Sequence, residues 1–147
     1  AVVALGELGD KAGEEVLKSL RELTKSTIHD DAHALSDAAL FAYARLARGN
    51  AEASATLVAE VTPWLAADAA PEDQVKALAA LANAEIEDSA VVQRAAELVT
   101  GENADVRLAA AEFLQNRPGG DPTGAVANLA GDTDQRIQAF VSRINQP

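Results

Sequence analysis

Apolar residues recur at helical spacing along most of the chain. Three segments give the clearest examples, with apolar positions three and four residues apart: Val75, Leu78, Ala79 and Ala82; Val106, Ala109, Ala110 and Phe113; Ile137, Phe140, Val141 and Ile144. Residues at this spacing share one face of an α-helix. The sequence does not alternate with period two over a useful length, and β-branched residues do not cluster, so the pattern predicts an all-α fold.

Further helices of the same kind are predicted between these segments. Their apolar faces are formed by Val16, Leu20 and Leu23 in residues 11–25, by Leu57, Val61, Trp64 and Leu65 in residues 51–67, and by Val91, Val92, Ala95, Leu98 and Val99 in residues 88–100. Residues 123–130 have only Val126 and Leu129 as large apolar side chains, which predicts a short and weakly held helix. Trp64 is expected in the core rather than as an exposed anchor.

Glycine and proline mark the predicted helix ends. Gly49 follows a helical segment, Pro71 suits the first turn of the next helix, and residues 118–122 (PGGDP) are predicted to be a loop. Pro63 interrupts a helical pattern, where it removes a backbone hydrogen bond and crowds the preceding turn. We therefore expect a kink near Thr62 or a new helix that starts there.

We expect the helices to pair into repeats of 29 to 38 residues. Val75 and Val106 occupy equivalent places 31 residues apart, and the motif Asp-x-Arg at 105–107 recurs at 134–136 after 29 residues. A helix pair of this size cannot bury its apolar face alone and must stack on its neighbours. We expect one domain of about nine helices, a fragment of a longer chain, over residues 1–147, with approximate repeats 1–26, 27–67, 71–100, 103–130 and 132–145.

A turn motif near the start of the chain resembles a known repeat family. Residues 4–10 (ALGELGD) are followed by an apolar helix pattern at residues 16–23, and together they resemble a HEAT-like repeat of the armadillo/HEAT class. The Asp-x-Arg motifs at 105–107 and 134–136 are similar to the Asp and Arg near the start of the first helix in that family, where they typically form a ladder between successive repeats. The resemblance implies an α-solenoid of stacked antiparallel helix pairs.

The resemblance also implies a function. HEAT-like arrays are usually interaction scaffolds that present the second helix of each pair along a concave face, which implies a non-enzymatic scaffold that binds a protein or peptide. The candidate partner surface would then consist of Glu14, Glu15, Lys18, Glu22, Glu52, Thr56, Glu60, Gln93, Arg94 and Glu97. Ordinary solvated helix faces have the same mixed composition. The alternative is a ligand-handling helical domain, similar to the HEAT arrays of lipid-transfer proteins or bilin lyases.

The chain has an excess of acidic residues, which disfavours some classes of binding partner. Asp and Glu number 23 against 12 Lys and Arg, which gives a formal net charge of −11. Such a surface repels a nucleic-acid backbone and an anionic membrane, so neither is expected as a partner. A basic protein partner fits the charge, as does solubility alone. The sequence has no run of about 18 apolar residues, so no membrane span is predicted.

The sharpest chemical motif contains both histidines of the chain. Residues 26–37 (STIHDDAHALSD) place His29, His33 and Asp37 four residues apart, on one face if all three lie within a helix over residues 27–48. Two imidazoles and a carboxylate can bind zinc. However, the aspartates of this segment suit a helix N-terminus, and no second histidine cluster supplies further ligands. We expect a helix start rather than a metal site here.

The sequence contains no pattern typical of catalysis. The chain has no cysteine and only two histidines, and it lacks both a nucleophile motif such as G-x-S-x-G and a glycine-rich loop after a strand. The carboxylates at residues 85–88 fall in a predicted turn, where a solvated loop is the simpler interpretation. We expect neither catalytic residues nor a cofactor.

Overall fold

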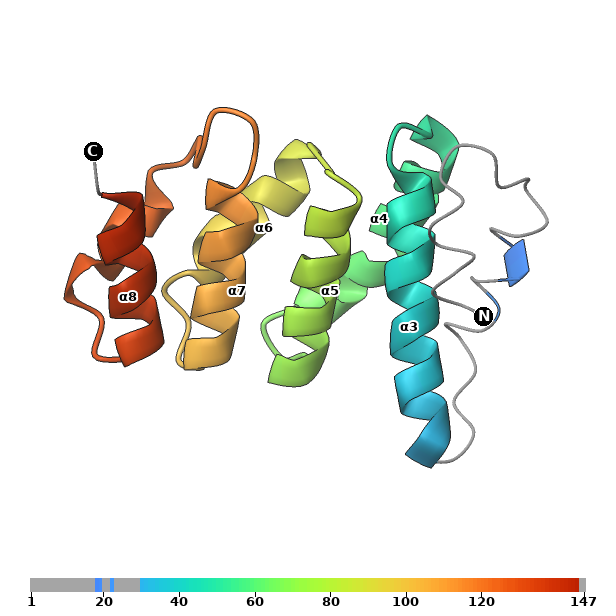
Figure 1. Cartoon of the computed structure of the whole chain (residues 1–147), viewed down its shortest axis with the longest axis horizontal. Helices are drawn as coiled ribbons and strands as arrows, with labels where there is room; N and C mark the ends of the chain where they lie inside the picture. The colour runs from blue at the N-terminus through green and yellow to red at the C-terminus, as the bar shows by residue number, and fades with distance from the viewer. Residues whose placement is uncertain (1–17, 20–21, 23–29, 146–147) are drawn as a thin grey trace. The chain divides into compact units, whose positions relative to one another are not determined.

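The computed structural model describes residues 18–19, 22 and 30–145, with side chains from residue 37 onward in the longer segment. Within these residues the chain is helical and forms no strand, so the all-α prediction is confirmed. The elements, drawn in Figure 1, are α3 (Asp30–Ala47), α4 (Ala51–Val61), the 3-10 helix η2 (Thr62–Leu65), α5 (Pro71–Asn83), α6 (Ser89–Leu98), α7 (Ala104–Gln115), the 3-10 helix η3 (Ala125–Gly131) and α8 (Gln135–Ile144). The count of nine helices extends beyond the described residues and stays a prediction.

The chain divides into two compact units. The first contains Ala1–Glu60 together with Asn83–Ile86, and the second contains Val61–Ala82 together with Glu87–Pro147. The single domain predicted over residues 1–147 stays a prediction.

In the first unit, the turn between α3 and α4 confirms the helix end predicted at Gly49. Gly49 has a φ of +77°, a left-handed conformation that glycine adopts without a Cβ clash. The Asn50 side-chain oxygen then accepts a hydrogen bond from the backbone N–H of Ala53 at 3.0 Å and caps the start of α4. The buried Tyr43 hydroxyl donates to the Ala53 carbonyl at 3.3 Å. These bonds tie α3 to the first turn of α4.

The break predicted at Pro63 is also present. The α-helix α4 ends at Val61, and η2 begins at Thr62 with Pro63 in its first turn. A proline ring has no N–H to donate to the preceding turn, which explains why the α-helix does not continue. Leu65 is buried, but Trp64 is only half-buried. The Trp64 side chain is therefore neither fully in the core, as predicted, nor a fully exposed anchor.

In the second unit, the helices pack in two layers. Figure 1 shows α5, α7 and α8 side by side with α6 behind them. The helix α6 packs against α7, and η3 contacts α6, α7 and α8. The interior contains fully buried large side chains, among them Leu78, Leu81, Leu114 and Ile137. Burial of one such side chain contributes about 1.5–3 kcal/mol, so these residues hold the layers together.

The buried faces agree with the sequence pattern in α6 and differ from it in α5. All five residues predicted for the α6 face are buried. In α5 the predicted Leu78 is buried, but Val75 and Ala79 are half-buried and Ala82 is exposed. Gln74 is buried in their place, and its amide donates to the Ala66 carbonyl at 2.7 Å, which satisfies a polar group that would otherwise be costly to bury. The α5 face is thus turned by one residue from the prediction.

The remaining elements of this unit largely follow their patterns. In α7, Val106, Ala110 and Phe113 are buried while Ala109 is half-buried. In α8, Ile137 and Phe140 are buried, while the predicted Val141 and Ile144 are half-buried. The short helix predicted at residues 123–130 is the 3-10 helix η3, which follows Gly124 in a left-handed conformation with a φ of +72°. Residues 116–124 form the loop before it.

Candidate functional site

A bidentate ion pair joins the start of α7 to the segment before α8. The Arg107 Nε donates to Asp132 Oδ2 at 2.8 Å, and its second terminal nitrogen donates to Asp132 Oδ1 at 3.0 Å. The remaining nitrogen donates to the carbonyls of Gly101 and Glu102. The two side chains are 16% and 7% exposed. The hydrogen bond from Arg107, with the N–H of Asp134, lowers the pKa of Asp132, and the same ion pair raises the pKa of Arg107.

A second, exposed ion pair runs between the same two helix starts. Arg136 donates to Asp105 Oδ1 at 2.6 Å and to Asp134 Oδ2 at 2.9 Å. Asp134 also caps α8, because its carboxylate accepts the backbone N–H of Arg136 at 2.8 Å. The side-chain hydrogen bond from Arg136, followed by this backbone bond, lowers the pKa of Asp134 to about 2. The structure therefore brings the two Asp-x-Arg motifs into direct contact.

Beside this ion-pair cluster, a groove runs between α5 and α7. Its volume is about 420 Å³, and its lining residues are Pro71, Glu72, Val75, Lys76, Asn103, Asp105, Leu108, Ala109 and Glu112. Asn103 fixes the near end of α7, because its side-chain oxygen accepts the backbone N–H groups of Asp105 at 2.9 Å and Val106 at 3.2 Å. We call this feature the α5–α7 groove.

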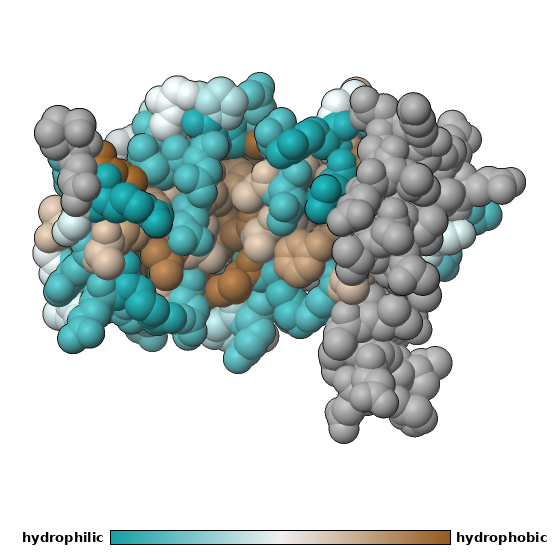
Figure 2. All heavy atoms as spheres, viewed as in Figure 1, coloured by the Kyte–Doolittle hydropathy of each residue, from teal (hydrophilic) through white to brown (hydrophobic). Residues whose placement is uncertain are grey.

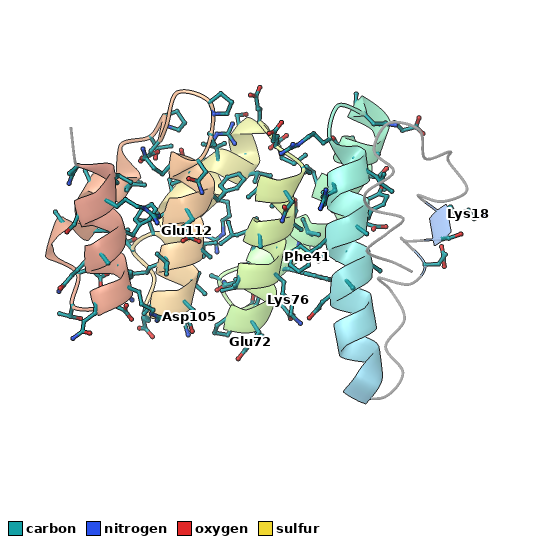
Figure 3. The ribbon with its side chains drawn as sticks, in the orientation of Figure 1. Lys18, Phe41, Glu72, Lys76, Asp105 and Glu112 are labelled. Carbon is teal, nitrogen blue, oxygen red and sulfur yellow. The ribbon has the colours of Figure 1, made fainter. Side chains whose placement is uncertain are left out.

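The floor of the α5–α7 groove is apolar and its rim is charged. Val75 from α5 and Leu108 and Ala109 from α7 are half-buried and form the floor. Figure 2 shows hydrophobic surface at this place with hydrophilic side chains on both sides. Figure 3 shows the charged residues, with Glu72 and Lys76 along α5 and Asp105 and Glu112 along α7.

Carboxylates outnumber cations in the lining of the groove. Glu72, Asp105 and Glu112 are exposed, and Lys76, half-buried, is the one cation among the lining residues. Glu72 and Asp105 lie in the first turns of their helices, where negative charge complements the helix dipole. Glu112 lies in the last turn of α7 (Ala104–Gln115), where the dipole favours a cation instead. The charge of Glu112 is therefore not explained by its own helix.

The partner surface predicted from the sequence does not line the α5–α7 groove. Lys18, Glu22, Glu52, Gln93 and Glu97 are exposed, Thr56, Glu60 and Arg94 are half-buried, and Glu14 and Glu15 lie outside the described residues. Arg94 is engaged within the second unit, where its Nε donates to the Leu65 carbonyl at 2.7 Å and its terminal nitrogen pairs with Glu97.

Sequence reasoning missed the groove itself. Its floor residues Val75 and Ala109 were placed on the buried faces, because an alanine-rich helix has apolar residues on several sides and spacing alone does not select one. One signal was present: Leu108 is a large apolar residue that the predicted α7 face leaves out.

Of the three candidate metal ligands, only Asp37 has a described side chain. His29 lies outside the described residues, as does the side chain of His33, and Asp37 is half-buried in α3. Across residues 18–19, 22 and 30–145, no group of three or more His, Cys, Asp or Glu residues is placed to hold a metal ion. The interpretation of residues 26–37 as a helix start stays a prediction.

The loop at residues 118–122 uses its own carboxylate to satisfy nearby donors. Asp121 accepts hydrogen bonds from the Thr123 hydroxyl at 2.7 Å, the Thr123 N–H at 2.8 Å and the Val126 N–H at 2.9 Å. Partial burial opposes ionisation of Asp121, but these bonds outweigh it and lower the pKa of this residue. Asp121 thus satisfies the backbone N–H groups of Thr123 and Val126 at the end of this loop.

Comparison with known proteins identifies no relative of this chain. No family model matches the chain, and neither the curated proteins nor the solved structures contain a significant match. Within the described part of the chain, no helix has the length and apolar character that crossing a membrane requires.

Proposed function

We propose that the chain is a HEAT-like helical-repeat scaffold, an α-solenoid of stacked antiparallel helix pairs that binds a protein segment without catalysing a reaction. The contact between the Asp-x-Arg motifs supports the repeat interpretation, since Asp105 pairs with Arg136 and Arg107 with Asp132. The side-by-side arrangement of α5, α7 and α8 supports it as well.

The observation that carries the binding function is the α5–α7 groove. An apolar floor between two helices, flanked by charged side chains, has the make-up of a protein-binding surface, with an apolar centre and a polar rim. A volume of about 420 Å³ accommodates a few side chains of a partner segment. The lining includes no buried charged group of the kind that fixes a small polar substrate. The groove thus favours a protein segment over a small polar ligand.

The proposal is tested by selecting peptides from a displayed random library on the whole chain and measuring their affinity for two variants. Ala109→Arg places a long charged side chain in the groove floor, and Ala139→Arg makes the same change at an exposed position of α8 outside the groove. We expect the selected peptides to bind wild type and Ala139→Arg alike and to lose at least about tenfold in affinity for Ala109→Arg, because the floor is then filled.

Both variants are first compared with wild type by circular dichroism. If Ala109→Arg loses helix content, Val75→Gln takes its place as a smaller change in the same floor. Peptides that bind the folded floor variant as tightly as wild type would contradict a binding function for the groove. A lipid or other small apolar molecule that copurifies with the chain, detected by native mass spectrometry, would favour a ligand-handling domain instead.

A further inference from the structure

We infer that the α5–α7 groove receives a basic amphipathic protein segment, whose apolar side chains contact Val75, Leu108 and Ala109 and whose Lys or Arg side chains pair with Glu72 and Glu112. This inference rests on the proposed function and specifies the chemistry of the partner. It follows from three features of the groove: the apolar floor, the sign of the rim charge, and the position of Glu112 on α7.

The floor determines that the segment must be amphipathic. Val75, Leu108 and Ala109 are half-buried, so each keeps apolar surface in contact with water. Covering this apolar surface removes it from water, which favours a partner that presents apolar side chains to the floor. The charged residues on both sides require polar side chains at the edges of the same segment.

The charges on the rim determine whether the polar side chains of the partner should be basic or acidic. Asp105 is already paired with Arg136 at 2.6 Å, which leaves Glu72 on α5 and Glu112 on α7 as the exposed carboxylates on the two sides of the groove. Lys76, half-buried on α5, also lines the groove as its one cation, so the exposed carboxylates still outnumber the cations. A segment with Lys or Arg at its edges meets a carboxylate on each side. An acidic segment would face both carboxylates at close range, and like charges in contact disfavour binding.

Glu112 gives the most specific part of the inference. Because it lies in the last turn of α7, its carboxylate is close to the negative end of the helix dipole. A cation from a partner would neutralise the carboxylate and complement the dipole at once. Glu72 does not carry the same weight, since an acidic residue in the first turn of α5 is favourable without any partner.

The net charge of the chain requires a matched control. With a formal net charge of −11, the protein attracts any basic peptide to some extent. Glu87 and Glu102 are exposed carboxylates of the second unit that do not line the groove. The pair Glu87→Gln and Glu102→Gln therefore removes the same charge as Glu72→Gln and Glu112→Gln while leaving the groove intact.

The experiment uses three synthetic amphipathic peptides of equal length with the same leucine positions and with Lys, Gln or Glu at every polar position. Their affinities for the whole chain are measured by fluorescence anisotropy. We expect the Lys peptide to bind tightest and the Glu peptide weakest. The double variant Glu72→Gln, Glu112→Gln should lower the affinity for the Lys peptide about five- to tenfold, as expected for the loss of two exposed ion pairs. The control double variant Glu87→Gln, Glu102→Gln should change that affinity less than twofold.

The outcomes separate the chemistry of the partner from the existence of the site. An equal loss with the control pair would overturn the inference, because binding would then reflect net charge alone. The inference would also be overturned if the Gln or Glu peptide bound as tightly as the Lys peptide and if Ala109→Arg weakened that binding. That result would leave the proposed binding function intact. Binding of all three peptides that is insensitive to Ala109→Arg would contradict both.

Discussion

At the scale of residues, four side chains account for the contact between α7 and α8 at their starts. Arg107 is the central one, because it bonds both oxygens of Asp132 and two carbonyls of the segment before α7. The recurrence of Asp-x-Arg indicated a repeat, and the resemblance to HEAT-like repeats implied a contact of this kind between the two motifs. The sequence did not indicate that Asp132, two residues before the motif, accepts the buried bond while Asp105 forms the exposed one.

At this scale we predict that the ionised Asp134 makes the stability of the fold sensitive to acid. The pKa of Asp134 is about 2 in the folded chain against an ordinary value of 3.8. A lowered carboxylate pKa stabilises the fold above the ordinary pKa, and this contribution is lost as the pH falls toward the folded value. We expect the melting temperature of wild type to fall between about pH 5 and pH 2, and the fall to be less steep in Asp134→Asn.

Circular dichroism melts across this pH range measure the effect. Asparagine also caps helices, so the variant should fold at neutral pH. Asp121 and Asp132 have lowered pKa values as well, which is why the slope should decrease rather than vanish. An identical slope in both proteins would show that the ion pair of Asp134 with Arg136 contributes nothing to acid stability.

At the scale of elements, the sequence predicted helix ends better than helix faces. The break at Pro63 and the turn at Gly49 follow from the local chemistry of proline and glycine, and both are present. The α6 face was predicted because four of its five residues are large and apolar. The α5 face was turned by one residue because alanine fits several sides of a helix and a hydrogen-bonded Gln74 is buried.

At this scale we predict that the helix cap at the start of α7 contributes to the stability of the fold. Asn103 satisfies two backbone N–H groups at the start of this helix, which forms one wall of the α5–α7 groove. Asn103→Ala should lower the free energy of unfolding by about 1 kcal/mol. Asn128→Ala, at an exposed position of η3, serves as the control and should change it by less than about 0.5 kcal/mol. Urea denaturation measures both, and equal effects would contradict the role given to the cap.

At the scale of the whole molecule, the all-α class follows from the sequence, whereas the groove depends on tertiary packing. The helices α5 and α7 are separated along the chain by α6, so the groove between them depends on tertiary packing and not on either sequence segment alone. The partner surface predicted from the resemblance lies on other helices. We propose instead that binding occurs on the face of α5 and α7, and this location is the central claim.

Chemical-shift mapping of the isotope-labelled chain with a selected peptide tests that claim most directly. The proposal predicts that the largest backbone shift changes fall on residues of the groove, Val75, Lys76, Leu108, Ala109 and Glu112. Exposed residues of α4 and α6 such as Glu52, Gln93 and Glu97 should change little. The largest changes on α4 and α6, with the groove residues unmoved, would contradict the proposal and place binding on the surface that the resemblance implied.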